Sequence, residues 1–415
     1  MDDWRKLMIY DVIIIGGGPS GLMAANVLQK NHINYLVLEK NDQLAKKLKL
    51  TGGKRCNVTN NLPVDGFIES LNMKHRRFLY GALKAFGPDE IIAFFKQRGL
   101  GLLLEQGLKY FPETGKSQSV LDALTMDLEL DCIKYREGVK SIEKKDQLFY
   151  LTTANDTWVS KTVIVGTGSK AYPTTGSSGD GVTFAERFGL EIIPFTPAET
   201  HVYASDVKKL YADLQGVTIS NAILSIEGTK KTFPGGVLFT HFGLSGPAVL
   251  HASEVIAEKM HEGDVYVTFP LTEMHENDVL ERYDKAIRNN EKCHLFLDEV
   301  LSKRLSKKVF EWLNLTDKNM SEYKKIDREK IIDTVLKFRL KIDQVEHIEK
   351  AFVNAGGIST KELDPKSMMV KKIPGLYFVG ETTDLQGPIG GFNLTIAFST
   401  GHLAAKDCIH KLNNV

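Results

Sequence analysis

Three glycines and one acidic residue near the start of the chain have the spacing of a nucleotide-phosphate site. Gly16, Gly18 and Gly21 form a G-x-G-x-x-G motif, and Glu39 follows about 18 residues later. Such glycines permit a tight turn, close approach of the backbone to a pyrophosphate and close packing of helix on strand. A carboxylate at this distance accepts both hydroxyl groups of a ribose and disfavours a 2′-phosphate. The pattern predicts a dinucleotide site, with an ordinary glycine turn as the alternative.

The segments around this motif have the pattern of a βαβ unit. Residues 11–15 are a β-branched run, which is typical of a strand buried on both faces of a parallel sheet. A helical stretch to about Gln29 and a second apolar strand at residues 35–39 follow it. The helix would begin near Pro19 and Ser20, where backbone N–H groups and about half a positive charge favour a phosphate.

Further glycine-rich strings follow apolar runs or precede a helix. Residues 162–165 lead into Gly166-Thr167-Gly168-Ser169, and residues 376–379 lead into Gly380 and Glu381. The string Gly390-Gly391-Phe392-Asn393 precedes a final helix predicted to end near Leu412. The first N–H groups of that helix are suited to the electron-rich edge of a ligand. The alternative interpretation is that the glycines only permit a sharp turn against the sheet.

The first motif and the two strand-end strings resemble those of the two-dinucleotide-binding-domain flavoproteins. The resemblance implies non-covalently bound FAD, with the 162–169 string passing beneath it and the acid at position 381 near its ribityl chain. That acid is usually Asp in the family and is Glu381 here. No second G-x-G-x-x-G follows a strand, so a separate NAD(P) domain is not expected. NAD(P)H stays open as an electron donor that visits the flavin directly.

Three longer strings are similar to one bacterial subfamily, the aminoacetone-oxidase-like or bile-acid-inducible-operon-like FAD oxidoreductases. They are residues 50–57 (LTGGKRCN), 239–247 (FTHFGLSGP) and 387–393 (GPIGGFN). The resemblance implies a β-rich domain with a helical appendage inserted into the FAD domain. The residues predicted to bind the cofactor are Gly16, Gly18, Pro19, Ser20, Gly21, Glu39, Lys40, Gly53, Arg55, Cys56, Asn57, Val139, Thr167, Gly168, Gly380, Glu381, Gly391, Phe392 and Asn393.

Three residues are weak candidates for catalysis. Cys56 is either a thiol near the flavin or a small buried hydrophobe, and it has no nearby cysteine partner for a redox disulfide. His241 is either a proton shuttle or a structural histidine. Tyr172 precedes the loop around Asp180, which either lines the flavin or caps the following helix.

Composition and charge exclude several classes of protein. The chain has 415 residues, 42% of them hydrophobic, and a formal charge of +1, so disorder and dedicated nucleic-acid binding are disfavoured. Its four cysteines have no close spacing, so no metal site is expected. No signal peptide or membrane span is apparent. We expect a soluble cytoplasmic protein with a small-molecule substrate, and neither a nucleic-acid nor a membrane partner.

The order of the predicted strands and helices along the chain indicates an α/β fold with an insertion. Residues 1–192 and 355–415 have the buried strands of a doubly wound, Rossmann-type FAD domain. Residues 193–354 form an inserted substrate domain, β-rich at first and helical from about residue 277. The many lysines of that helical part are interpreted as a solvated surface.

These features predict an FAD-dependent oxidoreductase that transfers a hydride between a small organic substrate and flavin N5. The reaction is either that of an oxidase or that of an NAD(P)H-linked reductase of an enone-like double bond. The missing nicotinamide domain slightly favours the oxidase. One alternative is a flavin-dependent RNA-modifying enzyme, which only the lysine-rich helical part supports. The other alternative is a flavin-binding protein without turnover.

Overall fold

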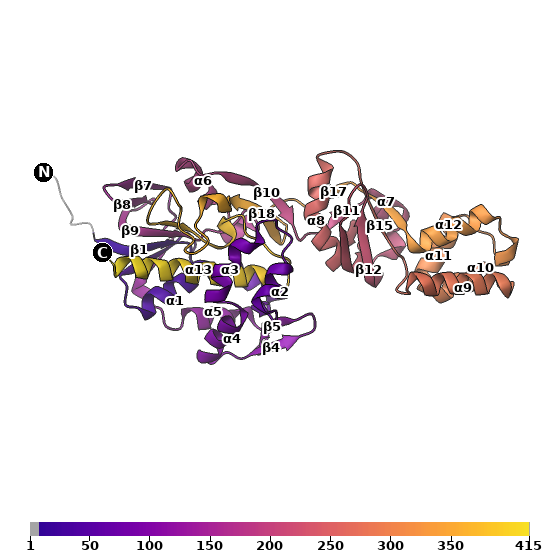
Figure 1. The fold of residues 1–415 in the computed structure, drawn as a ribbon, viewed down its shortest axis with the longest axis horizontal. Helices are drawn as coiled ribbons and strands as arrows, with labels where there is room; N and C mark the ends of the chain where they lie inside the picture. The colour runs from indigo at the N-terminus through magenta and orange to yellow at the C-terminus, as the bar shows by residue number, and fades with distance from the viewer. Residues whose placement is uncertain (1–7, 415) are drawn as a thin grey trace. The chain divides into compact units, whose positions relative to one another are not determined.

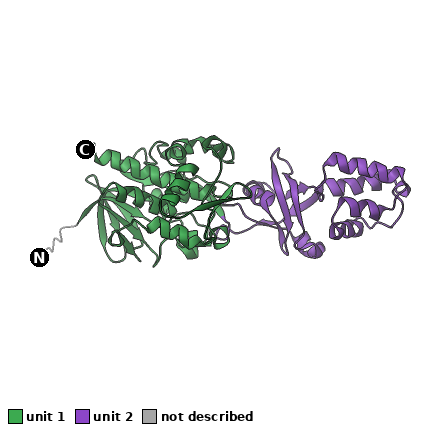
Figure 2. Cartoon of the chain, turned by 90° about the horizontal axis from the view of Figure 1, so that it is seen from below, with its two compact units in different colours: residues 1–196, 353–415 green, residues 197–352 purple. Residues whose placement is uncertain are grey.

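The chain divides into two compact units, each with its own hydrophobic core. The structure is a computed structural model that describes residues 8–414. Unit 1 comprises Met1–Thr196 and Val353–Val415, and unit 2 comprises Pro197–Phe352 (Figure 2). One cluster of buried apolar side chains belongs to unit 1 and a separate cluster belongs to unit 2.

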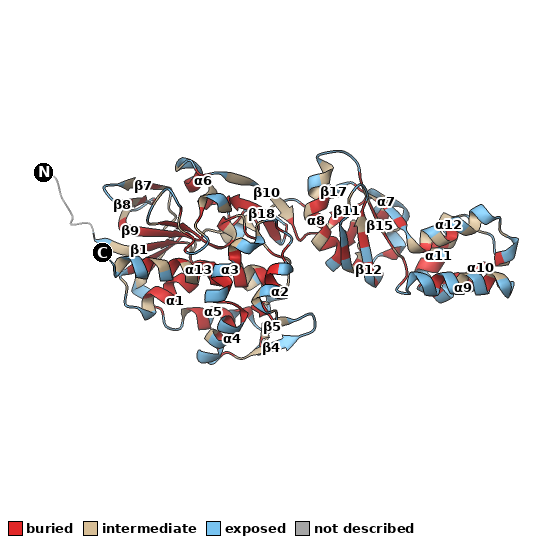
Figure 3. Cartoon of the chain, viewed as in Figure 1, coloured by how far each residue is buried: buried red, intermediate tan, exposed pale blue. Residues whose placement is uncertain are grey.

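A parallel sheet organises unit 1. Its strands run in the order β6-β2-β1-β9, and β19 pairs with the far side of β9. Successive β1 residues from Val12 to Ile15 pair with β2 on one side and with β9 on the other. All four are buried, as expected of a β-branched run with both faces covered (Figure 3). The strands are β1 (Ile9–Ile15), β2 (Tyr35–Glu39), β6 (Ile133–Tyr135), β9 (Thr157–Val165) and β19 (Leu376–Phe378).

Two helices from opposite ends of the chain pack together beside this sheet (Figure 1). Gly401 of α13 lies so close to α1 that a Cβ there would meet the Ser20 carbonyl oxygen at 2.2 Å. The helices of unit 1 are α1 (Pro19–Lys30), α2 (Val64–Glu69), α3 (Tyr80–Ala85), α4 (Pro88–Gln97), α5 (Ser117–Thr125), α6 (Asp180–Arg187) and α13 (Phe392–Leu412).

Antiparallel strands complete unit 1. In one group, β7 (Ser141–Lys145) pairs with β8 (Leu148–Thr152), and β8 pairs with the first half of β9. A three-stranded sheet has the order β3 (Thr59–Asn60), β5 (Lys109–Pro112), β4 (Leu102–Glu105). A two-stranded sheet joins β10 (Ile192–Ala198) to β18 (Val353–Ile358).

Unit 2 is built on an antiparallel seven-stranded sheet of order β16-β15-β12-β13-β14-β11-β17. Its strands alternate buried and exposed residues, the pattern of a sheet with one covered face. They are β11 (Val202–Tyr203), β12 (Thr218–Ile226), β13 (Thr232–Phe239), β14 (Gly243–Ser245), β15 (Val265–Phe269), β16 (Phe338–Ile342) and β17 (Gln344–Val345).

The second half of unit 2 is helical and carries balanced charge. Between residues 276 and 336 there are as many acidic as basic side chains. Several of them pair with one another, as Arg282 does with Glu291 and Lys308 with Glu311. The helices of unit 2 are α7 (Ser205–Leu210), α8 (Pro247–Met260), α9 (Glu276–Arg288), α10 (Cys293–Val300), α11 (Lys303–Trp312) and α12 (Lys325–Leu336).

The predicted fold class is confirmed: a Rossmann-type α/β domain is formed from both ends of the chain, with a β-rich, partly helical insertion. In the part of the chain that the structure describes, no helix has the length and apolar character needed to cross a membrane. Across residues 8–414, no three His, Cys, Asp or Glu side chains are grouped as metal ligands.

Candidate FAD-binding site

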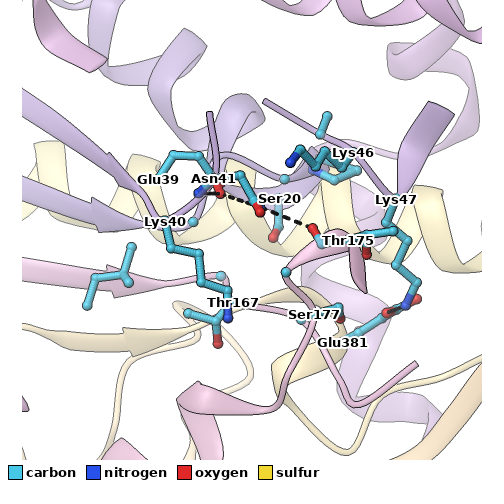
Figure 4. Close-up of a pocket in the computed structure, with 18 of the residues that line it drawn as sticks. Ser20, Glu39, Lys40, Asn41, Lys46, Lys47, Thr167, Thr175, Ser177 and Glu381 are labelled. Carbon is cyan, nitrogen blue, oxygen red and sulfur yellow. Dashed lines mark hydrogen bonds and ion pairs between the residues drawn. The ribbon is translucent and has the colours of Figure 1, made fainter. Parts of the chain in front are cut away.

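A pocket lies at the carboxyl ends of β1, β2 and β9. This is the edge of a parallel α/β sheet where ligands bind. Polar side chains from α1, the segment after β2, the loop after β9 and the turn after β19 line it (Figure 4). Segments far apart in the sequence thus converge on one cavity in unit 1.

Each of the three motif positions holds glycine for a different structural reason. A Cβ at Gly21 would lie 2.0 Å from the Gly16 carbonyl oxygen, and one at Gly16 would lie 2.6 Å from the Gly166 carbonyl oxygen. Gly16 also has φ +101°, which disfavours any other residue. At Gly18, by contrast, no atom lies within 4 Å of the added Cβ, although Gly18 lines the pocket. Protein packing requires the first and third glycines, and the second leaves room for a ligand.

The Glu39 carboxylate is held in place at the end of β2. Its Oε2 accepts the Gly17 N–H at 2.8 Å, and its Oε1 accepts the backbone N–H (2.8 Å) and side-chain Nδ2 (2.7 Å) of Asn41. Asn41 also donates to the Thr175 carbonyl oxygen at 3.1 Å, which brings the 175–177 loop to the same side of the pocket. The buried carboxylate is therefore fixed before any ribose reaches it.

Two cations of the pocket are paired with acids. Lys47 forms a 2.6 Å ion pair with Glu381, which also accepts a hydrogen bond from Ser169 Oγ at 3.2 Å (Figure 4). Lys40 forms a 2.6 Å ion pair with Asp180. Ammonium groups in such a pocket suit a pyrophosphate, and the acids hold them in place without it.

The N-terminus of α13 reaches the same pocket, where Asn393, Leu394 and Ala397 form part of its wall. In the amide orientation that satisfies its neighbours, the Asn57 side-chain oxygen accepts the Gly391 N–H at 3.0 Å. Gly391 has φ +89°, and a Cβ there would meet the Thr59 backbone at 2.4 Å. The double glycine therefore makes a sharp turn against β3, and the first turn of α13 faces the pocket.

The structure places eleven of the predicted cofactor residues in the lining of this pocket. They are Gly16, Gly18, Pro19, Ser20, Glu39, Lys40, Val139, Thr167, Gly168, Glu381 and Asn393. The others are outside the lining, and their contact with FAD stays a prediction: Gly21, Gly53, Arg55, Cys56, Asn57, Gly380, Gly391 and Phe392.

The three weak catalytic candidates do not line the pocket. Cys56 is completely buried, and burial raises the pKa of its thiol to about 12, with a partly opposing hydrogen bond to Thr51. A thiol with this pKa stays neutral at physiological pH. Tyr172 has a left-handed backbone just before the loop that reaches the pocket. His241 lies in unit 2, with its ring 4.8 Å from that of Phe242.

Several pocket residues were absent from the sequence-based prediction. They are Asn41, Lys46, Lys47 and Thr175, among others. Lys46 and Lys47 follow the second strand closely, and this position in the sequence could have indicated that they lie near the cofactor. Thr175 had no such signal, because its contact with Asn41 spans 134 residues of sequence. The loop around Asp180, for which lining the flavin was one of two interpretations, contributes Gly176, Ser177 and Asp180 to the lining.

The chain belongs to the family described as the HI0933-like protein Rossmann domain, whose model matches residues 10–407. It is 28% identical over 409 residues to a ribosomal RNA dihydrouridine synthase of Escherichia coli, covering 96% of this chain and 98% of that one. It is 29% identical over 405 residues to a 3-dehydro-bile acid delta(4,6)-reductase of Clostridium scindens, covering 95% and 97%.

Solved structures of flavoenzymes share the fold. A 3-ketosteroid delta1-dehydrogenase of Sterolibacterium denitrificans matches with a TM-score of 0.52 at 12% identity, covering 97% of this chain and 100% of that one. The FrdA subunit of E. coli quinol fumarate reductase matches with a TM-score of 0.52 at 13% identity, covering 98% and 71%. Family, fold and dinucleotide pocket together define the class: the chain is an FAD-dependent oxidoreductase.

Proposed function

We propose that this protein reduces a carbon–carbon double bond conjugated to a carbonyl group. The observation that carries the proposal is that the names of two relatives describe the same kind of reaction, the saturation of a double bond. A dihydrouridine synthase saturates a uracil double bond, and a delta(4,6)-reductase saturates double bonds of a bile acid. Both are reductions of a polarised double bond, so they favour the reductase direction over the oxidase direction.

The described residues have defined roles in this proposal. Glu39 binds the adenosine ribose of FAD, the N-terminus of α1 with Gly18 and Lys40 receives the pyrophosphate, and α13 stabilises the flavin N1/O2 edge. Bound FAD supplies hydride chemistry at N5. We infer that NADH or NADPH donates electrons directly to the flavin, and that the inserted unit is the substrate domain.

The test separates the two half-reactions under anaerobic conditions. The holoenzyme is mixed with NADH or NADPH, and bleaching is followed at about 450 nm. The reduced enzyme is then mixed with 2-cyclohexen-1-one, and cyclohexanone is measured by gas chromatography. We expect rapid recovery of the oxidised spectrum with one cyclohexanone formed per flavin. An enzyme that is reoxidised only by oxygen, and forms neither cyclohexanone from this enone nor dihydrouridine from a uridine-containing RNA, contradicts the proposal.

The second candidate is the same reduction on a uracil in RNA, which the name of the E. coli relative favours. The balanced charge of residues 276–336 gives it no support from electrostatics. We therefore keep a small molecule as the first substrate class and a cytoplasmic location as a prediction. We also infer, from the C. scindens relative, membership of the bile-acid-inducible-operon-like subfamily.

A further inference from the structure

The loop at residues 172–180 (the strap) packs against the segment that ends β2. Its backbone is left-handed at Tyr172 (φ +56°), Gly176 (φ +95°) and Gly179 (φ +80°). A residue other than glycine is unfavourable in this conformation and persists where surrounding contacts hold it. The strap contributes to the lining of the FAD pocket with Thr175, Gly176, Ser177 and Asp180. The contacts that hold the strap therefore also shape one wall of the pocket.

Asn41 connects the strap to the Glu39 carboxylate. Its side-chain nitrogen donates to Glu39 Oε1 at 2.7 Å and to the Thr175 carbonyl oxygen at 3.1 Å (Figure 4). An amide nitrogen has two N–H donors, so both are used in holding these two groups. A Cβ at Gly176 would lie 2.4 Å from the same nitrogen, so the strap comes closer to Asn41 than a residue with a side chain allows.

A second contact joins the same two segments at the neighbouring position. Lys40 Nζ pairs with Asp180 Oδ2 at 2.6 Å and also donates to Ser178 Oγ, whose hydroxyl donates to Asp180 Oδ1 at 2.8 Å. The side chains of Lys40 and Asp180 are 31% and 36% exposed, so solvent screens this ion pair and its contribution is modest. Residues 40 and 41 together fasten the strap at two points.

We propose that these two contacts form a clasp that closes the strap over the ribose of bound FAD and sets the rate at which FAD leaves. Asn41 is the positioning residue, because one of its N–H groups holds the Glu39 carboxylate and the other holds the strap. The inference rests on the ribose lying at Glu39, and it is independent of the substrate and of the direction of the reaction. Removal of either contact should shorten the lifetime of the complex without slowing the entry of FAD.

The strap is tested first in the apoprotein, where no ligand contributes. Amide hydrogen exchange is followed by mass spectrometry on peptides that cover residues 170–182, in the wild type, Asn41→Ala and Asp180→Asn. We expect exchange to be roughly tenfold faster in Asn41→Ala, which loses two hydrogen bonds, and about 2- to 5-fold faster in Asp180→Asn, which loses a partly exposed ion pair. Asn34→Ala is the matched control, because Asn34 Nδ2 donates to the Ile9 carbonyl oxygen at 3.3 Å, outside the pocket lining. Unchanged exchange of the strap in both clasp variants overturns the clasp.

The lifetime of bound FAD is measured next. Each holoenzyme is loaded with radiolabelled FAD and chased with excess unlabelled FAD, and the label that stays on the protein is counted over time. We expect release to be roughly tenfold faster in Asn41→Ala and about 2- to 5-fold faster in Asp180→Asn, with wild-type release in Asn34→Ala. The milder Asp180→Asn variant serves alone if Asn41→Ala binds FAD too weakly to be loaded. The association rate, from stopped-flow fluorescence of FAD, should not fall in either variant.

The two measurements separate a clasp from direct contact with FAD. Faster release without faster exchange of the strap would show that Asn41 and Asp180 only touch the cofactor, and this result overturns the clasp. Faster exchange with a wild-type release rate overturns the role of the strap in holding FAD. Neither readout involves the substrate, so both results stand even where the proposed double-bond reduction fails.

Discussion

At the scale of single residues, the three motif glycines differ in what surrounds them. Gly16 and Gly21 meet other backbone atoms, so any side chain there disturbs the packing of α1 on β1. Gly18 faces open space within the pocket, so only a ligand makes a side chain unfavourable there. Substitution of these positions separates the requirements of the fold from those of the cofactor.

Gly18→Ala should leave the stability of the apoprotein within about 0.5 kcal/mol of the wild type, as for a change without steric conflict. It should weaken FAD binding at least tenfold, because the new methyl group occupies the approach to the pyrophosphate. Fluorescence titration with FAD and thermal unfolding of the apoprotein measure the two effects. Gly21→Ala is the contrasting variant and should destabilise the apoprotein itself. Normal FAD affinity in Gly18→Ala would place the pyrophosphate elsewhere.

Residues with a local signal could be predicted from the sequence, and residues defined by long-range contact could not. Gly18 and Glu39 were found because strand, turn, helix and acid follow one another within one short stretch. Thr175 was missed because its partner Asn41 is 134 residues away in the sequence. His241, which stood out in a glycine-rich string, lies in unit 2 beside the ring of Phe242.

At the scale of secondary structure, helix α13 contains a partly buried titratable group, His402, outside the lining of the FAD pocket. The His402 ring stacks on Phe86 with a centroid distance of 4.5 Å, and its Nδ1 is buried without a hydrogen-bond partner among the described residues. Burial lowers the pKa of His402 from 6.5 to about 4, and the charge of Lys406 adds to this effect. The neutral imidazole is therefore the form that the fold accommodates.

This pKa shift makes the stability of unit 1 depend on pH. Between pH 6.5 and 4 the unfolded chain binds a proton at His402 and the folded chain does not, so stability falls as the pH is lowered through this window. The contribution above pH 6.5 amounts to up to about 3 kcal/mol of stability. His402→Leu should lose less stability than the wild type between pH 7 and 4.5 in urea unfolding followed by tryptophan fluorescence. Parallel losses in both proteins would contradict this role.

The elements themselves were predicted where the hydrophobic pattern is strong. The first βαβ unit and the final helix from about residue 393 are present. Apolar residues with helical spacing continue from Ser117 to Leu130, but helix α5 ends at Thr125 and a 3₁₀ turn at Leu130–Cys132 follows it. The order of the unit 2 strands was not predictable, because β11 pairs with β14 and β17, whose positions depend on tertiary packing.

At the scale of the whole molecule, the two units have separate hydrophobic cores and the pocket lies in one of them. We therefore expect two transitions in calorimetric unfolding of the full chain. Addition of FAD at about 100 times its dissociation constant should stabilise the unit 1 transition by about 2.7 kcal/mol and leave the unit 2 transition in place. A single transition that moves as a whole with FAD would refute this independence.

The central claim is that FAD binds in the pocket where Glu39 ends β2. The most direct measurement is titration of the apoprotein with FAD, for the wild type, Glu39→Gln and Glu143→Gln. Glu143 is the matched control, because it lies on β7 in an ion pair with Lys145, outside the pocket lining. We predict one FAD per chain, a loss of about 10- to 100-fold in affinity for Glu39→Gln, as for a charged hydrogen bond, and wild-type affinity for Glu143→Gln. Equal affinity in all three proteins would contradict the account.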